Sequence, residues 1–83
     1  MRILYFGWVR TNIGLGTEEI SLPPDVENVE DLIEFLRGQG DGYRAAFENI
    51  KAIRVAVDQE MADMATPLNG SKEVALFPPM TGG

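Results

Sequence analysis

The stretch Asn28-Val29-Glu30-Asp31-Leu32-Ile33-Glu34-Phe35-Leu36 decides the fold, because it predicts the one long helix of this 83-residue chain. Its apolar residues recur at the i, i+3, i+4, i+7 spacing of one helix face, at Val29, Leu32, Ile33 and Leu36. Asn28 precedes this pattern and is a residue type that caps helix N-termini. Asp31 follows three residues later, where a negative charge is favourable near the positive end of the helix dipole. Because glycine ends many helices, we expect this helix to end at Gly38 or Gly40.

Short apolar segments on both sides of this helix predict the strands of a sheet. We expect a strand over residues 1–10, which are rich in aromatic and aliphatic side chains, and a second over residues 17–22. Residues 11–16 contain two glycines and an asparagine, so they predict the connection of an N-terminal hairpin. Apolar residues alternate along 53–57, and residues 72–77 follow an Asn-Gly turn, so both segments are predicted strands.

This order of elements predicts an α+β fold, in which one long helix packs on one face of a mixed sheet. This is the β-grasp arrangement. A chain of 9.1 kDa has room for one core, so we expect a single domain over residues 1–77 and an extended arm over residues 78–83. Between the helix and the third strand, residues 43–47 are expected to form one short helical turn with Phe47 directed inward.

The chain contains neither cysteine nor histidine. The lack of cysteine excludes disulfides, thiolate metal sites and a thiol nucleophile. The lack of histidine removes the usual general base and the commonest metal ligand. Glu18 and Glu19 are adjacent in a predicted strand, so their side chains face opposite ways and do not form a catalytic pair. We therefore expect no resident cofactor, no metal site, and no catalysis by the chain alone.

Charge and hydropathy also narrow the range of partners. The net charge of −6 repels phosphate backbones, and the seven basic residues are scattered, so nucleic acid is not an expected partner. The longest apolar runs are far shorter than the roughly 20 residues of a membrane-spanning helix. The N-terminal residues do not resemble a signal peptide, and we expect a cytoplasmic protein.

The C-terminal stretch Glu73-Val74-Ala75-Leu76-Phe77-Pro78-Pro79-Met80-Thr81-Gly82-Gly83 carries the strongest functional signal. Pro78 and Pro79 cannot continue donating to a sheet, so the chain should leave the domain after Phe77. The remaining residues reach about 20 Å when extended, far enough to enter a pocket on another protein. Gly82 and Gly83 lack Cβ atoms and can pass through a narrow channel. The alternative is that these residues are a frayed terminus without a function.

An exposed apolar patch is expected beside the root of this arm. If Ile3, Tyr5 and Val9 face the helix, the period of two in a strand directs Leu4, Phe6 and Trp8 to the opposite face. The same count places Ala75 and Phe77 on that face. Contiguous exposed apolar residues usually mark an interface. The alternative is a one-residue bulge that buries Phe6 in place of Tyr5.

These residues resemble a known family. The ending Phe77-Pro78-Pro79-Met80-Thr81-Gly82-Gly83 is similar to that of the small, sulfur-carrying subunits of molybdopterin synthase, which are ubiquitin-like β-grasp proteins. The segment from Ile3 to Arg10 and the segment Val55-Ala56-Val57-Asp58-Gln59 are similar to the family's first and third strands. The likeness extends over nearly the whole chain and is loosest over residues 37–50.

The resemblance implies a sulfur-transfer mechanism and a set of partners. An adenylating enzyme related to those that activate ubiquitin would use ATP to convert the terminal carboxylate into an acyl-adenylate, a step that involves nucleotide binding. A sulfur donor such as a cysteine desulfurase would then give a thiocarboxylate. The large subunit of molybdopterin synthase would accept the arm, in a heterotetramer that sulfurates cyclic pyranopterin monophosphate.

The resemblance also implies roles for individual residues. Gly83 would carry the adenylate and then the thiocarboxylate, and Gly82 would thread the channel. Arg10 is either an ion-pair partner of the activating enzyme or a solvated side chain. The remaining expected contacts with partner proteins are Phe6, Met61, Phe77, Pro78, Pro79, Met80 and Thr81.

Three other functions remain open at this point. The chain could carry sulfur for another pathway, such as thiamine synthesis, amino-acid synthesis or RNA thiolation. It could be a ubiquitin-like modifier that forms isopeptide bonds with lysines. It could also be a plain binding module with an inert tail.

Overall fold

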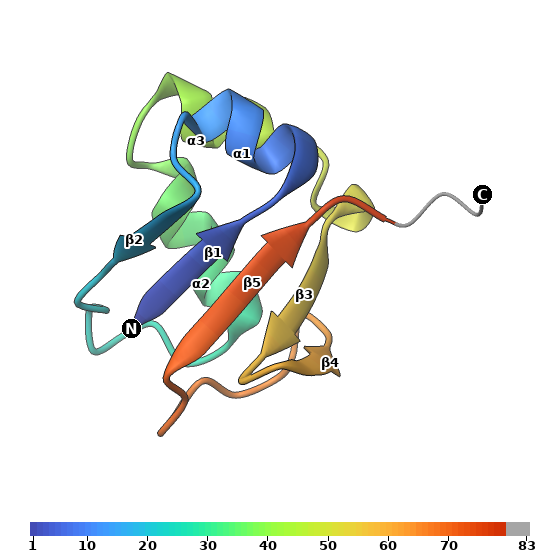
Figure 1. The fold of residues 1–83 in the computed structure, drawn as a ribbon. Coiled ribbons are helices and arrows are strands. Elements are labelled where there is room, and N and C mark those ends of the chain that lie inside the picture. The colour runs from blue at the N-terminus through green and yellow to red at the C-terminus, as the bar shows by residue number, and fades with distance from the viewer. Residues whose placement is uncertain (80–83) are drawn as a thin grey trace.

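A computed structural model describes residues 1–79 of the chain (Figure 1). The elements, in chain order, are β1 (Arg2–Tyr5), α1 (Gly7–Ile13), β2 (Thr17–Glu19), α2 (Val29–Arg37), α3 (Asp41–Ala46), the 3₁₀ turn η1 (Ile50–Ala52), β3 (Arg54–Val57), β4 (Glu60–Ala62) and β5 (Glu73–Phe77). The strands form one five-stranded sheet in the order β2-β1-β5-β3-β4. The central strand β5 pairs in parallel with β1, and the other neighbours are antiparallel. The predicted α+β, β-grasp fold is confirmed.

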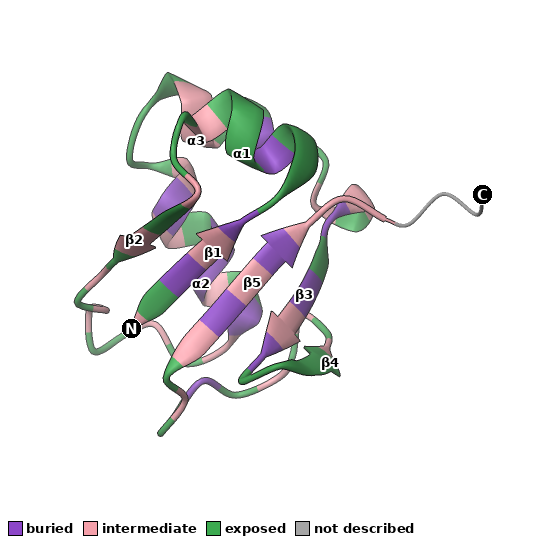
Figure 2. Ribbon diagram, viewed as in Figure 1, coloured by how far each residue is buried: buried purple, intermediate pink, exposed green. Residues whose placement is uncertain are grey.

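The core lies between the sheet and α2, which Figure 1 shows behind β1 and β5. Buried and less buried residues alternate along β1, β3 and β5, as the period of two in a strand requires (Figure 2). The largest fully buried side chains are Tyr5, Phe47, Ile3, Leu32, Ile33, Leu36, Leu76, Val9, Val29, Val55 and Val74. All four predicted apolar positions of α2 are therefore in the core.

Helix α2 has the predicted boundaries. The side chain of Asn28 accepts a hydrogen bond from the backbone N–H of Asp31 at 2.9 Å and so caps the first turn. Glu30 and Asp31 occupy this first turn, and Arg37 occupies the last, which matches the helix dipole at both ends. The helix ends at Gly38, one of the two predicted sites.

The predicted first strand is wrong beyond Tyr5, because residues 7–13 form helix α1. Gly7 has a φ of +57°, which turns the chain out of the sheet directly after Phe6. The helix ends at Gly14, whose φ is +89° and whose N–H donates to the Arg10 carbonyl at 2.7 Å. Val9 is buried, as predicted, but from a helix instead of a strand. The strands on either side still pair antiparallel, so the predicted pairing is confirmed although a helix connects them.

Three further strand predictions need correction. The second strand covers Thr17–Glu19 and stops three residues before the predicted end at Leu22. Strands β3 and β5 each begin one residue later than predicted, at Arg54 and Glu73. Strand β4 was not predicted at all.

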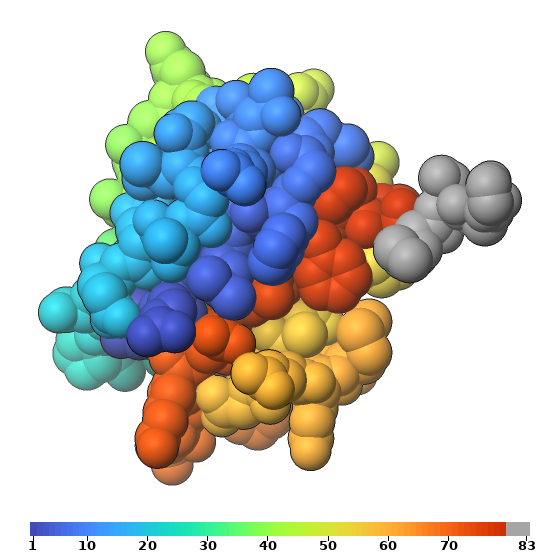
Figure 3. Space-filling model, in the orientation of Figure 1, coloured from blue at the N-terminus to red at the C-terminus, as the bar shows by residue number. Residues whose placement is uncertain are grey.

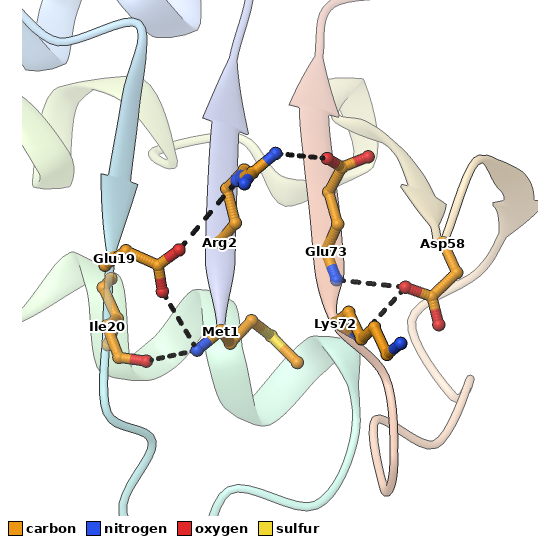
Figure 4. A network of polar contacts seen from close by, with 7 residues as sticks. All are labelled: Met1, Arg2, Glu19, Ile20, Asp58, Lys72 and Glu73. Carbon is orange, nitrogen blue, oxygen red and sulfur yellow. Dashed lines mark hydrogen bonds and ion pairs between the residues drawn. The ribbon is translucent and has the colours of Figure 1, made fainter.

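A turn without glycine explains why β4 was missed. Asp58 and Gln59 connect β3 to β4 as a two-residue hairpin turn, and both have positive φ, at 49° and 70°. Such turns usually contain glycine or asparagine. Here the Asp58 carboxylate accepts hydrogen bonds from the N–H groups of Lys72 and Glu73, at 2.9 and 3.0 Å (Figure 4). These bonds hold the turn against the first residue of β5 and offset the strain of its backbone.

The short helical segment predicted at residues 43–47 corresponds to α3, and Phe47 is buried as expected. Helix α3 packs against α1 at a very close approach. A Cβ atom built on Gly42 would overlap the carbonyl oxygen of Asn12, and it would lie 3.4 Å from the Cα atom of Ile13. Position 42 therefore has no room for a side chain without a backbone shift.

Replacing Gly42 with alanine is expected to lower the free energy of unfolding by about 1–3 kcal/mol, the usual cost of overpacking. Gly38→Ala is the matched control, because a Cβ there meets only the Phe35 carbonyl oxygen at 3.5 Å, an ordinary contact. Urea unfolding of both variants measures the difference. Equal stabilities for the two variants would contradict the close packing of α1 on α3.

Candidate functional site

The open face of the sheet, opposite α2, carries a row of apolar side chains across four strands. Leu4 of β1 lies opposite Ala75 of β5, Ala75 lies opposite Ala56 of β3, and Ala56 lies opposite Met61 of β4. Leu4, Ala56 and Ala75 are half-buried, whereas Met61 is 68% exposed. Figure 3 views this face, and the segments of β1, β5 and β4, coloured blue, red and yellow to orange, adjoin one another on it.

A second group of apolar side chains lies nearer the end of β5. The N–H of Phe6 donates to the Leu76 carbonyl at 3.1 Å, so the pairing of β1 with β5 continues one residue beyond the strand. Phe6 is extended and follows the inward-facing Tyr5, so its side chain lies on the open face, where it is 48% exposed. Phe77 is the last residue of β5 and is half-buried. We call Leu4, Phe6, Ala56, Met61, Ala75 and Phe77 together the open-face patch.

The opposite end of the same face is charged (Figure 4). Arg2 lies 3.9 Å from a carboxylate oxygen of Glu19 and 3.7 Å from one of Glu73. The amino group of Met1 lies 3.5 Å from Glu19 and donates to the Ile20 carbonyl at 2.9 Å. Ionic contacts thus occupy the start of β1 and β5, and the apolar surface begins toward the end of β5, where the chain leaves the sheet.

The structure brings together the sheet residues that the sequence singled out. Phe6 and Phe77 lie on the open face, and Met61 shares that face through its pairing with Ala56. The alternative of a bulge that buries Phe6 is wrong, because Tyr5 is 0% exposed and Phe6 is on the surface. Pro78 and Pro79 follow directly after the patch and are half-buried. Met80, Thr81, Gly82 and Gly83 lie outside the described residues.

Of the other two positions considered, Trp8 differs from expectation and Arg10 does not. Trp8 is 39% exposed but belongs to α1, so the strand alternation that placed it beside Phe6 does not apply. Arg10 is exposed in the last turn of α1, and a Cβ built on Gly16 would lie 3.2 Å from its guanidinium carbon. Arg10 therefore extends across the loop that leads into β2.

Sequence reasoning assigned no role to Ala56, which lies at the centre of the patch. Its strand register would have placed Ala56 in the patch, because it pairs with Ala75 on one side and with Met61 on the other. That register depends on β4, and β4 was hidden by the unusual Asp58-Gln59 turn.

Behind the sheet, Glu18 supports the fold through two tyrosines. Its Oε2 atom accepts hydrogen bonds from the hydroxyls of Tyr5 and Tyr43, each at 2.7 Å. Burial, followed by the hydrogen bond to Glu18, raises the pKa of Tyr43 to about 12. The same causes raise the pKa of Tyr5 far above its usual value. The cluster ties β1, β2 and α3 together.

These raised pKa values predict a loss of stability at alkaline pH. The unfolded chain releases its tyrosine protons near pH 10, roughly the ordinary value, while the folded chain still holds them. The free energy of unfolding should therefore be at its full value below about pH 10 and fall as the pH rises toward about 12. Urea unfolding across this range measures the slope. The slope should be smaller for Tyr43→Phe, and an unchanged slope would contradict the prediction.

Among residues 1–79, none of the helices combines the length and apolar character needed to cross a membrane. Within the same residues there is no group of three or more acidic side chains placed to hold a metal ion.

Comparison with known proteins supports a single family. A sulfur carrier subunit of molybdopterin synthase from Escherichia coli K12 is 35% identical over 83 residues, which cover 100% of this chain and 99% of that protein. The subunit of the same name from Haemophilus influenzae is 32% identical with the same coverage. The crystal structure of SAMP1 from Haloferax volcanii superposes with a TM-score of 0.72 at 25% identity, covering 100% of this chain and 98% of that one. The ThiS family pattern matches residues 3–83, so the chain belongs to the ThiS family.

Proposed function

We propose that the chain is the sulfur carrier subunit of a molybdopterin synthase, with the sulfur held at the Gly83 carboxyl group. The observation that carries the proposal is the open-face patch, which runs without interruption into the root of an arm ending in Gly82-Gly83. The names of the relatives at 32–35% identity over the full chain support it further.

The chemistry begins at a group that is unreactive by itself. A terminal carboxylate has a pKa of about 3.3–3.7, so at neutral pH it is ionised and a poor electrophile. In the proposed first step, a carboxylate oxygen attacks the α-phosphorus of ATP and pyrophosphate leaves, which gives an acyl-adenylate. In the second step, sulfur at the oxidation level of sulfide attacks the acyl carbon and AMP leaves. The product is a C-terminal thiocarboxylate.

The folded domain supplies recognition in this scheme. The chain has no cysteine or histidine, so the activating and sulfurating groups belong to the partner proteins. Apolar side chains that become buried at an interface supply most of its affinity. The open-face patch is the surface proposed to dock on the adenylating enzyme and later on the synthase large subunit, in a heterotetramer. Because one face serves both partners, they bind in turn.

The decisive measurement is the intact mass of the full chain after incubation with ATP, an adenylating enzyme, a cysteine desulfurase with its substrate, and a thiol. The thiol reduces the persulfide of the desulfurase, releases its outer sulfur as sulfide and is itself oxidised to a disulfide. We expect a mass increase equal to the replacement of one oxygen by sulfur. A reaction without ATP is the control and should give no increase. A mass that stays constant with an adenylating enzyme proven active on its own carrier would overturn the proposal.

A ubiquitin-like modifier is the second candidate, favoured by the likeness over the whole chain to SAMP1, small archaeal modifier protein 1. Both functions use the same activated carboxyl group, but here a lysine amine displaces AMP and forms an isopeptide bond. The two are separated by proteomics of cells that produce the chain. Because the last basic residue is Lys72, trypsin would leave residues 73–83 on each modified lysine. Branched peptides of this kind that disappear with the Gly83 deletion would identify a modifier.

A further inference from the structure

We propose that Gly7 is a positioning residue for the C-terminal arm. Because Gly7 has no side chain, the Pro78 ring packs directly against its backbone, and we call this contact the seat. The seat sets the direction in which the arm leaves the domain. Its relevance to sulfur transfer rests on the proposed function. The seat itself is a property of the fold and can be tested separately.

Gly7 and Pro78 approach each other so closely that no side chain fits between them. A Cβ atom built on Gly7 would lie 2.6 Å from Cγ and 2.9 Å from Cδ of Pro78. Real Cβ atoms do not approach other carbons this closely, so any side chain at position 7 must displace the proline ring. The ring includes the backbone nitrogen and Cα of Pro78, which follow directly after β5, so it cannot rotate away independently of the backbone. A side chain at Gly7 would therefore move the start of the arm.

Gly7 differs in this respect from the other glycines with positive φ. Gly14, at +89°, and Gly70, at +80°, have no heavy atom within 4 Å of a built Cβ. At those positions glycine is favoured by the backbone conformation alone. Gly7, at +57°, combines that conformation with a close approach of another segment. A requirement for empty space next to Pro78 is specific to Gly7.

The seat completes a set of constraints on the last residues of β5. The Phe6 N–H holds the Leu76 carbonyl at 3.1 Å, and Phe77 lies opposite Arg54 in the register with β3. Pro78 and Pro79 have no N–H, so the chain cannot donate hydrogen bonds to the sheet at these two residues. Packing of the proline ring on Gly7 orients the chain there. Figure 1 shows the chain after β5 passing close to the first turn of α1.

The direction set at Pro78 matters because Gly83, the proposed reactive residue, follows Pro78 in the chain. A misplacement of about 1 Å can slow a positioned reaction 100-fold. Gly7 is not part of the open-face patch, and of the patch residues only Phe6 and Phe77 adjoin Gly7 and Pro78, so docking should change less than the chemistry.

The test compares Gly7→Ala with Gly14→Ala. Both variants place an alanine at positive φ, at +57° and +89°, but only Gly7→Ala meets Pro78. In the adenylation assay, we expect Gly7→Ala to lose about tenfold or more in kcat relative to Gly14→Ala, with a smaller change in its KM for the adenylating enzyme. Thermal unfolding of both variants confirms that the assay temperature lies below their transitions.

NMR spectroscopy gives a readout that does not depend on activity. The wild-type chain should show nuclear Overhauser contacts between the Gly7 Hα protons and the Pro78 ring. Gly7→Ala should shift the amide resonances of Phe77 and Met80, and Gly14→Ala should not. In the Pro78→Ala background, where the smaller side chain leaves room, the effect of Gly7→Ala on these resonances should diminish.

The outcomes separate this inference from the proposed function. If the wild-type chain accepts sulfur but Gly7→Ala matches Gly14→Ala in kcat, the positioning role is overturned and the sulfur carrier stands. If the wild-type chain accepts no sulfur, the proposed function fails, and the NMR comparison alone tests whether the Pro78 ring packs against Gly7. Absent contacts between Gly7 and Pro78, or equal shifts in the two variants, would then overturn the seat.

Discussion

Removal of Gly83 is expected to abolish the gain of sulfur while leaving the affinity for the adenylating enzyme within about twofold, because buried apolar anchors carry most of the affinity of an interface. The shortened chain still ends in a glycine carboxylate, at Gly82. That carboxylate, however, lies one residue, or about 3.3 Å, short of its place in the active site of the enzyme. Nucleophilic attack requires the reacting atoms to approach within about 3–3.5 Å, so a deficit of this size removes the productive geometry.

Two measurements on the same samples test this expectation. Intact-mass analysis after incubation with ATP and sulfur donor reports the chemistry, and isothermal titration calorimetry with the adenylating enzyme reports docking. The 83-residue chain is the control, because it differs from the shortened chain only in the length of its arm. Sulfur uptake by the shortened chain at the wild-type rate would show that the terminal residue is not the carrier.

The parts of the fold that local sequence patterns determine were predicted well. Helix α2 was predicted with its cap and its buried face, because Asn28 and the spacing of Val29, Leu32, Ile33 and Leu36 agree with each other. The alternation along β1 and β5 correctly predicted that Tyr5 is buried and Phe6 exposed. In these elements, local preference and burial favour the same structure.

The errors occur where long-range packing overrides local preference. Residues 7–13 include a tryptophan, a valine, a threonine and an isoleucine, types that favour strands. They form α1 nevertheless, because Val9 is buried in the core and the helix packs against α3 at Gly42. The glycines at positions 7 and 14 bracket this helix and were the available signal, but a glycine alone does not reveal what packs beside it.

In the candidate site, too, local patterns predicted some residues, whereas others depend on long-range packing. Phe6 and Phe77 were placed on one face by counting along single strands, and the arm was expected from its prolines. Met61 was predicted as a partner contact only from the family resemblance. Its position depends on β4 and on an Asp58-Gln59 turn that lacks the usual glycine. The contact of Gly7 with Pro78 joins segments about as far apart in the chain as this protein allows, and no local pattern predicts it.

Met61 offers the sharpest test of the open-face patch, because its side chain can be changed at almost no cost to the folded domain. It is 68% exposed, so replacement by aspartate removes few contacts and should change the free energy of unfolding by less than about 0.5 kcal/mol. At an interface, the same change would place a charge among apolar groups and leave it without a partner. We expect the affinity for the adenylating enzyme and for the synthase large subunit to fall by at least about 30-fold, equivalent to about 2 kcal/mol.

Leu15→Asp is the matched control for this substitution. Leu15 is also an exposed apolar residue, at 43%, but it precedes β2, at the opposite edge of the sheet from Met61 in β4. Calorimetric titration of both variants against both partners gives four affinities. If only Met61→Asp loses affinity, and loses it for both partners, then one face serves activation and sulfur delivery. The two complexes then exclude each other. Equal losses for the two variants would mean that the added charge, and not the face, weakens binding, and the patch would lose its role in docking.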